Sequence, residues 1–220
     1  MRLNLENPHV TRFVILHDDP LDPASVSGNV ITRPHLSRGR ASYAEFLSLF
    51  GTYNPAGINV VINTDIVLDQ TDTPKLQTVK EGEVYCVTRY RVTDDISHRR
   101  YAEIPWSSFE YEHSKFTFCI TADVWAFRGV YRGQPLPDVT MGIPFCDGLI
   151  NYHFFDAGYR LWNIAPSFRS YHYHRDATRD HPYSYPKTRC LELRPIALEK
   201  IPTADYTRYC RDMRSKLYPG

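Results

Sequence analysis

The stretch from residue 58 to residue 69 constrains the fold of this chain more than any other part of the sequence. It reads Ile-Asn-Val-Val-Ile-Asn-Thr-Asp-Ile-Val-Leu-Asp, and its first half is rich in β-branched residues. Such a short apolar run is typical of a strand that is buried on both faces. Asp65 follows the run, and ligands of open α/β sheets bind outside the carboxyl ends of strands. Its carboxylate suits Mg²⁺ or Mn²⁺, although an aspartate here could simply close a strand-end turn.

Further apolar segments alternate between strand and helix patterns. Ser42 and Glu45 form a capping-box pattern that predicts a helix from Tyr43, with Gly51 as its end. Besides the run from Ile58, we expect strands over residues 10–17, 84–92, 117–127 and 159–164, and further helices over 147–158 and 204–217. Strands that alternate with helices predict the α/β class. The sequence shows neither an internal repeat nor a linker, so we expect one domain over residues 1–220.

Composition narrows the possible classes of function. With a net charge of +1, the chain as a whole gives no argument for binding nucleic acid or a membrane surface. No apolar run reaches the roughly 18 residues that span a bilayer. The five cysteines are widely spaced and form no Cys-x-x-Cys pair, so they suggest neither a zinc site nor a disulfide framework. The N-terminus lacks the apolar core of a signal peptide, and we expect a cytoplasmic protein.

Several short blocks follow one another in a fixed order. They are Asn63–Asp69 (NTDIVLD), Val87–Tyr90 (VTRY), Asp123–Phe127 (DVWAF), Gly142–Gly148 (GIPFCDG), Gly158–Tyr159 (GY), Asn163–Ser167 (NIAPS) and His172–His174 (HYH). This ordered set resembles a family of small glycosyltransferase-like proteins with the GT-A fold, the fold of nucleotide-diphospho-sugar transferases. The resemblance runs from about Asn7 to Arg175. Each block alone is a weak signal, and the set says little about the substrate.

The resemblance implies a GT-A-like domain with a mixed, mostly parallel central sheet flanked by helices. It implies a metal-dependent glycosyltransferase that moves a sugar from a nucleotide-diphosphate donor to an unknown acceptor, a glycan or, as the minority interpretation, DNA. In such an enzyme Asp65 would bind Mn²⁺ or Mg²⁺, which neutralises the diphosphate leaving group. Asn63, Thr64 and Arg89 would contact the donor, although Arg89 could instead pair with Asp65.

The remaining candidate residues follow from the later blocks. His172 and His174 are candidates for further metal ligands, because residues two apart in an extended segment face the same way. Surface phosphate contact or core packing would also explain them. Asp147 and Asp123 are the candidate catalytic carboxylates, one of which would take the proton of the acceptor. Asp147 could alternatively cap the following helix, and we expect Trp125 to pack in the core.

One departure from the family concerns the opening strand, which in the family precedes the segment matching residues 4–8. It is absent from this sequence, so a partner chain or the loop of residues 18–40 would have to complete the nucleotide pocket. This departure also supports an alternative, a non-catalytic binding protein on a truncated GT-A core. A metal-dependent phosphohydrolase is a third possibility. Arg169, Arg175, Arg179 and His181 make the region after residue 168 locally basic, which suits a diphosphate or a polyanion.

Overall fold

The computed structural model describes residues 2–17, 30–34, 41–63, 65–92, 109–111, 122–136, 139–141, 146–172 and 190–212. In chain order its elements are α1 (Arg2–Leu5), β1 (Phe13–His17), β2 (Val30–Pro34), α2 (Tyr43–Tyr53), β3 (Ile58–Ile62), β4 (Ile66–Leu68), η2 (Thr73–Thr78), β5 (Glu83–Val87), β6 (Tyr90–Val92), β7 (Phe109–Tyr111), β8 (Val124–Arg128), α3 (Cys146–Asp156), β9 (Arg160–Asn163), β10 (Ser170–His172), β11 (Leu191–Leu193), η5 (Leu198–Thr203), η6 (Tyr206–Arg208) and β12 (Cys210–Asp212). Within these ranges no helix has the length and apolar character that crossing a membrane requires.

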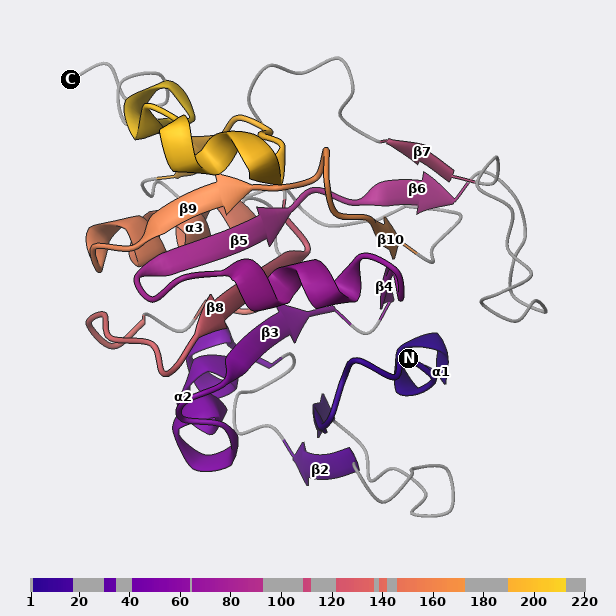
Figure 1. Cartoon of the computed structure of the whole chain (residues 1–220). Helices are drawn as coiled ribbons and strands as arrows, with labels where there is room; N and C mark the ends of the chain where they lie inside the picture. The colour runs from indigo at the N-terminus through magenta and orange to yellow at the C-terminus, as the bar shows by residue number, and fades with distance from the viewer. Residues whose placement is uncertain are drawn as a thin grey trace, which may run out of the picture.

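The central sheet has the strand order β3-β8-β5-β9 (Figure 1). Strand β8 runs antiparallel to both β3 and β5, and only β5 and β9 pair in parallel. The predicted α/β class is therefore confirmed, whereas the prediction of a mostly parallel central sheet is wrong. The reason is the direction of β8. Ile62 and Val87, the last residues of β3 and β5, both pair with Val124, the first residue of β8, so the chain enters β8 at the edge where its two neighbours end.

Both faces of the central sheet are buried. Trp125 and Phe127 of β8 pack on one face against α2 and α3, while Val124 and Ala126 pack on the other face with residues of η2 and η5. Figure 1 shows η2 on one side of the sheet and α2 and α3 on the other. Burial on both faces explains why the strands are continuous apolar runs instead of alternating ones. Trp125 is a core residue, as expected, and its indole N–H donates to Asn151 Oδ1 at 2.9 Å.

The start of α2 confirms the predicted capping box. The Ser42 hydroxyl accepts from the N–H of Glu45, and the Glu45 carboxylate accepts from the N–H of Ser42. The predicted end of the helix at Gly51 is two residues short. Helix α2 continues to Tyr53, and Asn54 ends it by donating its backbone N–H to Phe50 O.

The expected strand over residues 84–92 is two strands in different sheets. Strand β5 belongs to the central sheet, and β6 belongs to a second sheet with the order β4-β10-β6-β7. The chain changes sheet at Thr88 and Arg89. Their side chains are held by other segments: Asn163 donates to the Thr88 hydroxyl at 2.8 Å, and Arg89 forms an ion pair with Asp123.

The expected helix over residues 204–217 is wrong where the structure describes it. Residues 206–208 form the short helix η6, and β12 follows as the antiparallel partner of β11. Tyr206 and Tyr209 turn their rings onto Trp162 of the central sheet, with centroid distances of 5.0 and 6.1 Å. Packing of these tyrosines on the sheet overrides the local helical preference. Residues after 212 lie outside the described part of the chain.

Candidate functional site

Five candidate residues lie around one edge of the central sheet. Asp65 follows β3, Arg89 follows β5, and Asp123 directly precedes β8. They share this edge because β3 and β5 end where the antiparallel β8 begins. His172 ends β10, and Asp147 lies in the first turn of α3. We refer to these five residues as the strand-end cluster.

The structure brings Asp65 and His172 together although they are far apart in the sequence. Strand β10 pairs with β4 so that His172 lies opposite Ile66, the residue after Asp65. Nε2 of His172 lies 3.1 Å from Oδ2 of Asp65. The imidazole is buried, with 6% of the side chain exposed, whereas 29% of the Asp65 side chain is exposed. The pair therefore combines a buried imidazole with a partly exposed carboxylate.

Asp123 is the buried carboxylate of the cluster. Its Oδ1 accepts from Nη1 of Arg89 at 2.8 Å, while its Oδ2 is buried and has no hydrogen-bond partner among the described residues. Burial raises the pKa of Asp123 to about 7, against the lowering effect of Arg89; the charge of Asp147 raises it further. Arg89 thus pairs with Asp123.

Asp147 is held by donors from three segments. The hydroxyl of Tyr43 lies 3.4 Å and the thiol of Cys146 lies 3.2 Å from its Oδ1, and the backbone N–H of Ala122 also donates to the carboxylate. Burial raises its pKa to about 6, and the Cys146 thiol and the Arg89 guanidinium limit the rise. Asp147 is the second residue of α3, so it lies inside the first turn and not at the N-cap. The residue as a whole is half-buried.

Tyr43 and Cys146 contact Asp147, although neither of them was a candidate residue in the sequence analysis. Tyr43 is the first residue of α2, and its hydroxyl lies 3.7 Å from Sγ of Cys146. Burial raises the pKa of Tyr43 well above its ordinary value, and Asp147 and Cys146 raise it further. The phenol therefore stays protonated and donates. Its position at the start of a capped helix was predictable, but its contact with a residue 104 positions later was not.

Arg169 is paired with two aspartates of the chain, whereas the basic character of its region had suggested a contact with a bound anion. Its Nε lies 2.5 Å from Asp72 Oδ2, and its Nη2 lies 3.4 Å from Asp69 Oδ1. The hydroxyl of Tyr171 donates to the second oxygen of Asp69 at 2.7 Å. This network joins β4, η2 and β10, so its charges serve to fix the strand that carries His172.

Two further candidate residues, Thr64 and His174, lie outside the described residues, as do Arg175, Arg179 and His181. Asn63 is half-buried directly after β3, and its carbonyl accepts from the N–H of Ile66 at 3.1 Å. This bond closes the turn on which Asp65 lies. Asp65 is therefore a strand-end turn residue, and its side chain is the one that reaches His172.

The strand-end cluster offers a divalent cation a small donor set. Within the described ranges, no group of three or more histidine, cysteine, aspartate or glutamate side chains could hold a metal ion. Asp65 and His172 supply one carboxylate and one imidazole, and Asp123 Oδ2 is a buried oxygen to which no described residue donates a hydrogen bond. Mg²⁺ and Mn²⁺ sites often have one or two protein ligands, with waters and substrate phosphates as the others. The residues present fit such a partial site.

No family model, curated protein or solved structure matches this chain. What the chain does is therefore inferred from the contacts and charges of the strand-end cluster.

Proposed function

We propose that this chain is a metal-dependent glycosyltransferase that uses a nucleotide-diphosphate sugar, with the strand-end cluster as its active site. The observation that carries the proposal is the contact between Asp65 and His172, 3.1 Å apart, beside two carboxyl groups with raised pKa values. Perturbed carboxyl groups gathered at a strand end are typical of catalytic sites.

Asp65 and His172 are the residues that would hold Mn²⁺ or Mg²⁺. Such an ion offsets the negative charge of the diphosphate as it leaves the sugar. An imidazole ligates a metal ion in its neutral form. The hydrogen bonds of Asp69 with Tyr171 and Arg169 keep β10 against β4, which holds His172 at its distance from Asp65.

Asp147 is the residue that we assign as general base. At neutral pH a carboxyl group with a pKa of about 6 is mostly ionised, and it still attracts a proton more strongly than an ordinary aspartate. In an inverting transfer its oxygen would take the proton of the acceptor hydroxyl. Tyr43 and Cys146 donate to Oδ1 and so fix the orientation of the carboxylate.

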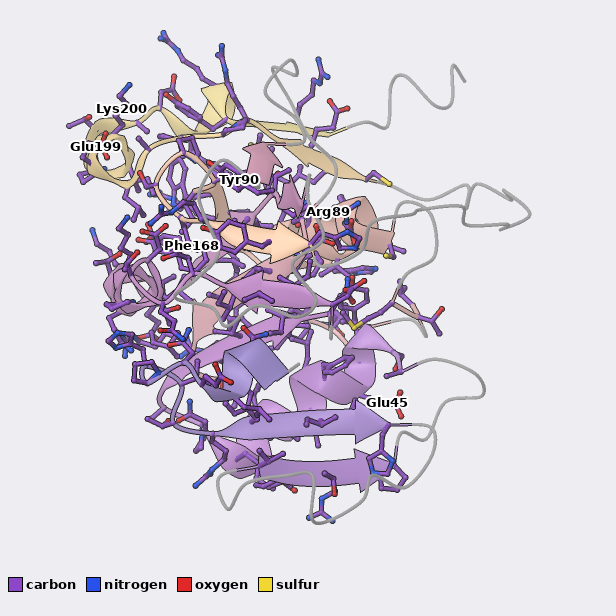
Figure 2. All side chains as sticks on the ribbon, turned by 90° about the vertical axis from the view of Figure 1, so that its right-hand side faces the viewer. Glu45, Arg89, Tyr90, Phe168, Glu199 and Lys200 are labelled. Carbon is purple, nitrogen blue, oxygen red and sulfur yellow. The ribbon has the colours of Figure 1, made fainter. Side chains whose placement is uncertain are left out.

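Asp123 is too deeply buried to meet the acceptor, so we assign it a positioning role. Its carboxylate holds the Arg89 guanidinium at 2.8 Å, at the end of β5 and beside Tyr90 (Figure 2). A guanidinium is suited to the oxygens of a phosphate, so we expect Arg89 to contact the donor. Asn63 and Thr64 are the other residues that we expect to contact the donor.

Calorimetric titration with a panel of nucleotide-diphosphate sugars, with and without Mn²⁺, tests this proposal. We expect one donor to bind only with the metal, and Asp65→Asn and His172→Gln to weaken that binding at least tenfold. Glu199→Gln is the matched control, since Glu199 is exposed on η5 and lies away from Arg89 in Figure 2. Failure of every donor to bind, or equal binding by Asp65→Asn, would contradict the proposal.

A second candidate is a non-catalytic binding protein on the same core. A cavity between two strands, away from the strand-end cluster and described below, favours this function. Assays of sugar release and transfer distinguish the two candidates, because a binding protein turns over no donor. Release of free phosphate from nucleotides would instead point to a phosphohydrolase.

A further inference from the structure

A cavity of about 590 Å³ separates β1 from β3. Its lining includes Phe13 and Val14 of β1 and the whole of β3, Ile58–Ile62. Strand β1 pairs only with β2, and β3 pairs only with β8, within the described part of the chain. The two strands therefore turn edges without a strand partner toward the same cavity.

The layers above and below this cavity are those that cover the paired strands. Phe46, Phe50 and Tyr53 of α2 line one side, and Leu68 of β4 and Leu76 of η2 line the other. Elsewhere in the structure the space between these layers is filled by strands of the central sheet. A strand placed in the cavity would therefore be covered by apolar side chains on both faces, as the strands of the central sheet are.

The backbone of β3 is oriented to bind such a strand. Gly57 O accepts from the N–H of Gly129 at 2.9 Å, and the register of β3 with β8 continues from this pair. Because hydrogen-bonded and non-hydrogen-bonded pairs alternate in an antiparallel ladder, the backbone groups of Ile58, Val60 and Ile62 point away from β8. The carbonyl of Ile58 accepts from Asn54 Nδ2 at 3.1 Å. The backbone N–H and C=O groups of Val60 point at the cavity.

The side chains next to the cavity are more exposed than the other apolar side chains of the central sheet. Ile58, Val60 and Ile62 are half-buried, whereas Val61 on the other face is fully buried. Every residue of β1, an apolar run, is also only half-buried. A strand between them would cover both sets at once.

The cavity also has a charge preference. Arg12 and Arg128 belong to its lining, and none of the other described lining residues is an aspartate or glutamate. Each guanidinium makes one contact with a backbone carbonyl, to Tyr53 O and Gln77 O respectively, which leaves further N–H donors. The lining therefore complements a segment that carries a carboxylate next to its apolar residues.

We propose that this cavity binds an extended peptide segment of a partner protein, apolar in its middle and acidic at one end, as an added strand between β1 and β3. The added strand would accept and donate main-chain hydrogen bonds along β3, the mode of β-strand addition seen at exposed sheet edges. This inference does not depend on the proposed glycosyl transfer, since neither Asp65 nor His172 lines the cavity.

The test measures fluorescence anisotropy with a labelled ten-residue peptide whose core is Val-Ile-Val-Ile-Val, flanked by two aspartates at one end and by serines at the other. We expect saturable binding to the full chain. The same peptide with N-methyl groups on alternate core residues keeps the apolar side chains but loses donors for the ladder, and it should bind at least tenfold more weakly. A version with lysines in place of the aspartates should also bind more weakly.

A variant of the protein provides an independent comparison. Val60→Pro removes an N–H that faces the cavity and not β8, and proline is tolerated at a strand edge that has no partner. It should keep the unfolding temperature within a few degrees and lose peptide binding. If this variant fails to fold, the N-methylated peptide on the unchanged protein still decides. Absence of binding, or equal affinity for the parent and N-methylated peptides, overturns the proposal.

Discussion

Replacement of Asp123 by asparagine should change how the stability of this protein depends on pH. Asp123 is buried, and its pKa is raised from 3.8 to about 7, chiefly by burial. The folded state therefore binds this proton more tightly than the unfolded state. Its contribution to stability is fully present below about pH 4 and is lost as the pH rises through about 7. The whole difference corresponds to about 4 kcal/mol.

The measurable part of this effect lies between pH 5 and pH 8. Over that interval the linkage relation gives a loss of about 3 kcal/mol from Asp123 alone. Asp147 acts in the same direction, with a pKa of about 6, and remains in the variant. Burial lowers the pKa of His153. The contribution of this histidine to the free energy of unfolding therefore decreases as the pH falls, which is opposite to the effect of Asp123. The difference between the two proteins reports the titration of Asp123 together with its charge coupling to Asp147.

Urea unfolding of the unchanged protein and of Asp123→Asn at four pH values from 5 to 8 measures the difference. The variant also loses the partner of Arg89, and because Asp123 is mostly anionic only above about pH 7, that loss is part of the pH-dependent difference. Glu199→Gln, which removes an exposed carboxylate of η5, is the control. If the stabilities of the unchanged protein and Asp123→Asn differ by a constant amount from pH 5 to pH 8, the raised pKa of Asp123 is refuted.

Two further predictions concern stability away from the site. Asn4→Ala should lower the free energy of unfolding by about 2–3 kcal/mol in chemical denaturation. The reason is that the buried side chain makes hydrogen bonds of 2.6 and 2.9 Å to the backbone of β4. Full stability in the variant would show that α1 is not docked against β4. Ser42→Ala should lower the free energy of unfolding by about 1 kcal/mol, because the capping box is lost. Ser48→Ala, on the exposed side of α2, should leave it almost unchanged. Equal effects of the two substitutions would contradict the role of the cap.

Local patterns in the sequence predicted local structure well. The capping box at Ser42 and the apolar run from Ile58 both correspond to elements in the structure, since each depends on residues only a few positions apart. The proximity of Asp65 to His172 was an expectation from the family resemblance, and the pairing of β4 with β10 produces it. Whether the pair binds a metal stays a prediction.

Features that depend on contacts between distant parts of the chain could not be predicted from local sequence patterns. The break of the expected strand 84–92 depends on Asn163 and Asp123, which bind Thr88 and Arg89 from distant segments. The antiparallel direction of β8 depends on the route of the chain through the second sheet, on which apolar periodicity carries no information. The contact of Tyr43 with the carboxylate of α3 likewise follows only from the packing of two helices on one face of the sheet.

The insertion of β8 between β3 and β5 also has a consequence for how this chain folds. Asn163 reaches Thr88 across 75 residues, and β8 pairs with β3 and β5, which both lie well before it in the chain, so most of the sheet depends on closing long loops. Topologies of this kind fold slowly. Until β8 is in place, β3 and β5 each have an uncovered edge that invites pairing with another molecule. Asp123 joins Arg89 only when β8 enters, so assembly of the strand-end cluster should coincide with the covering of these two edges during refolding.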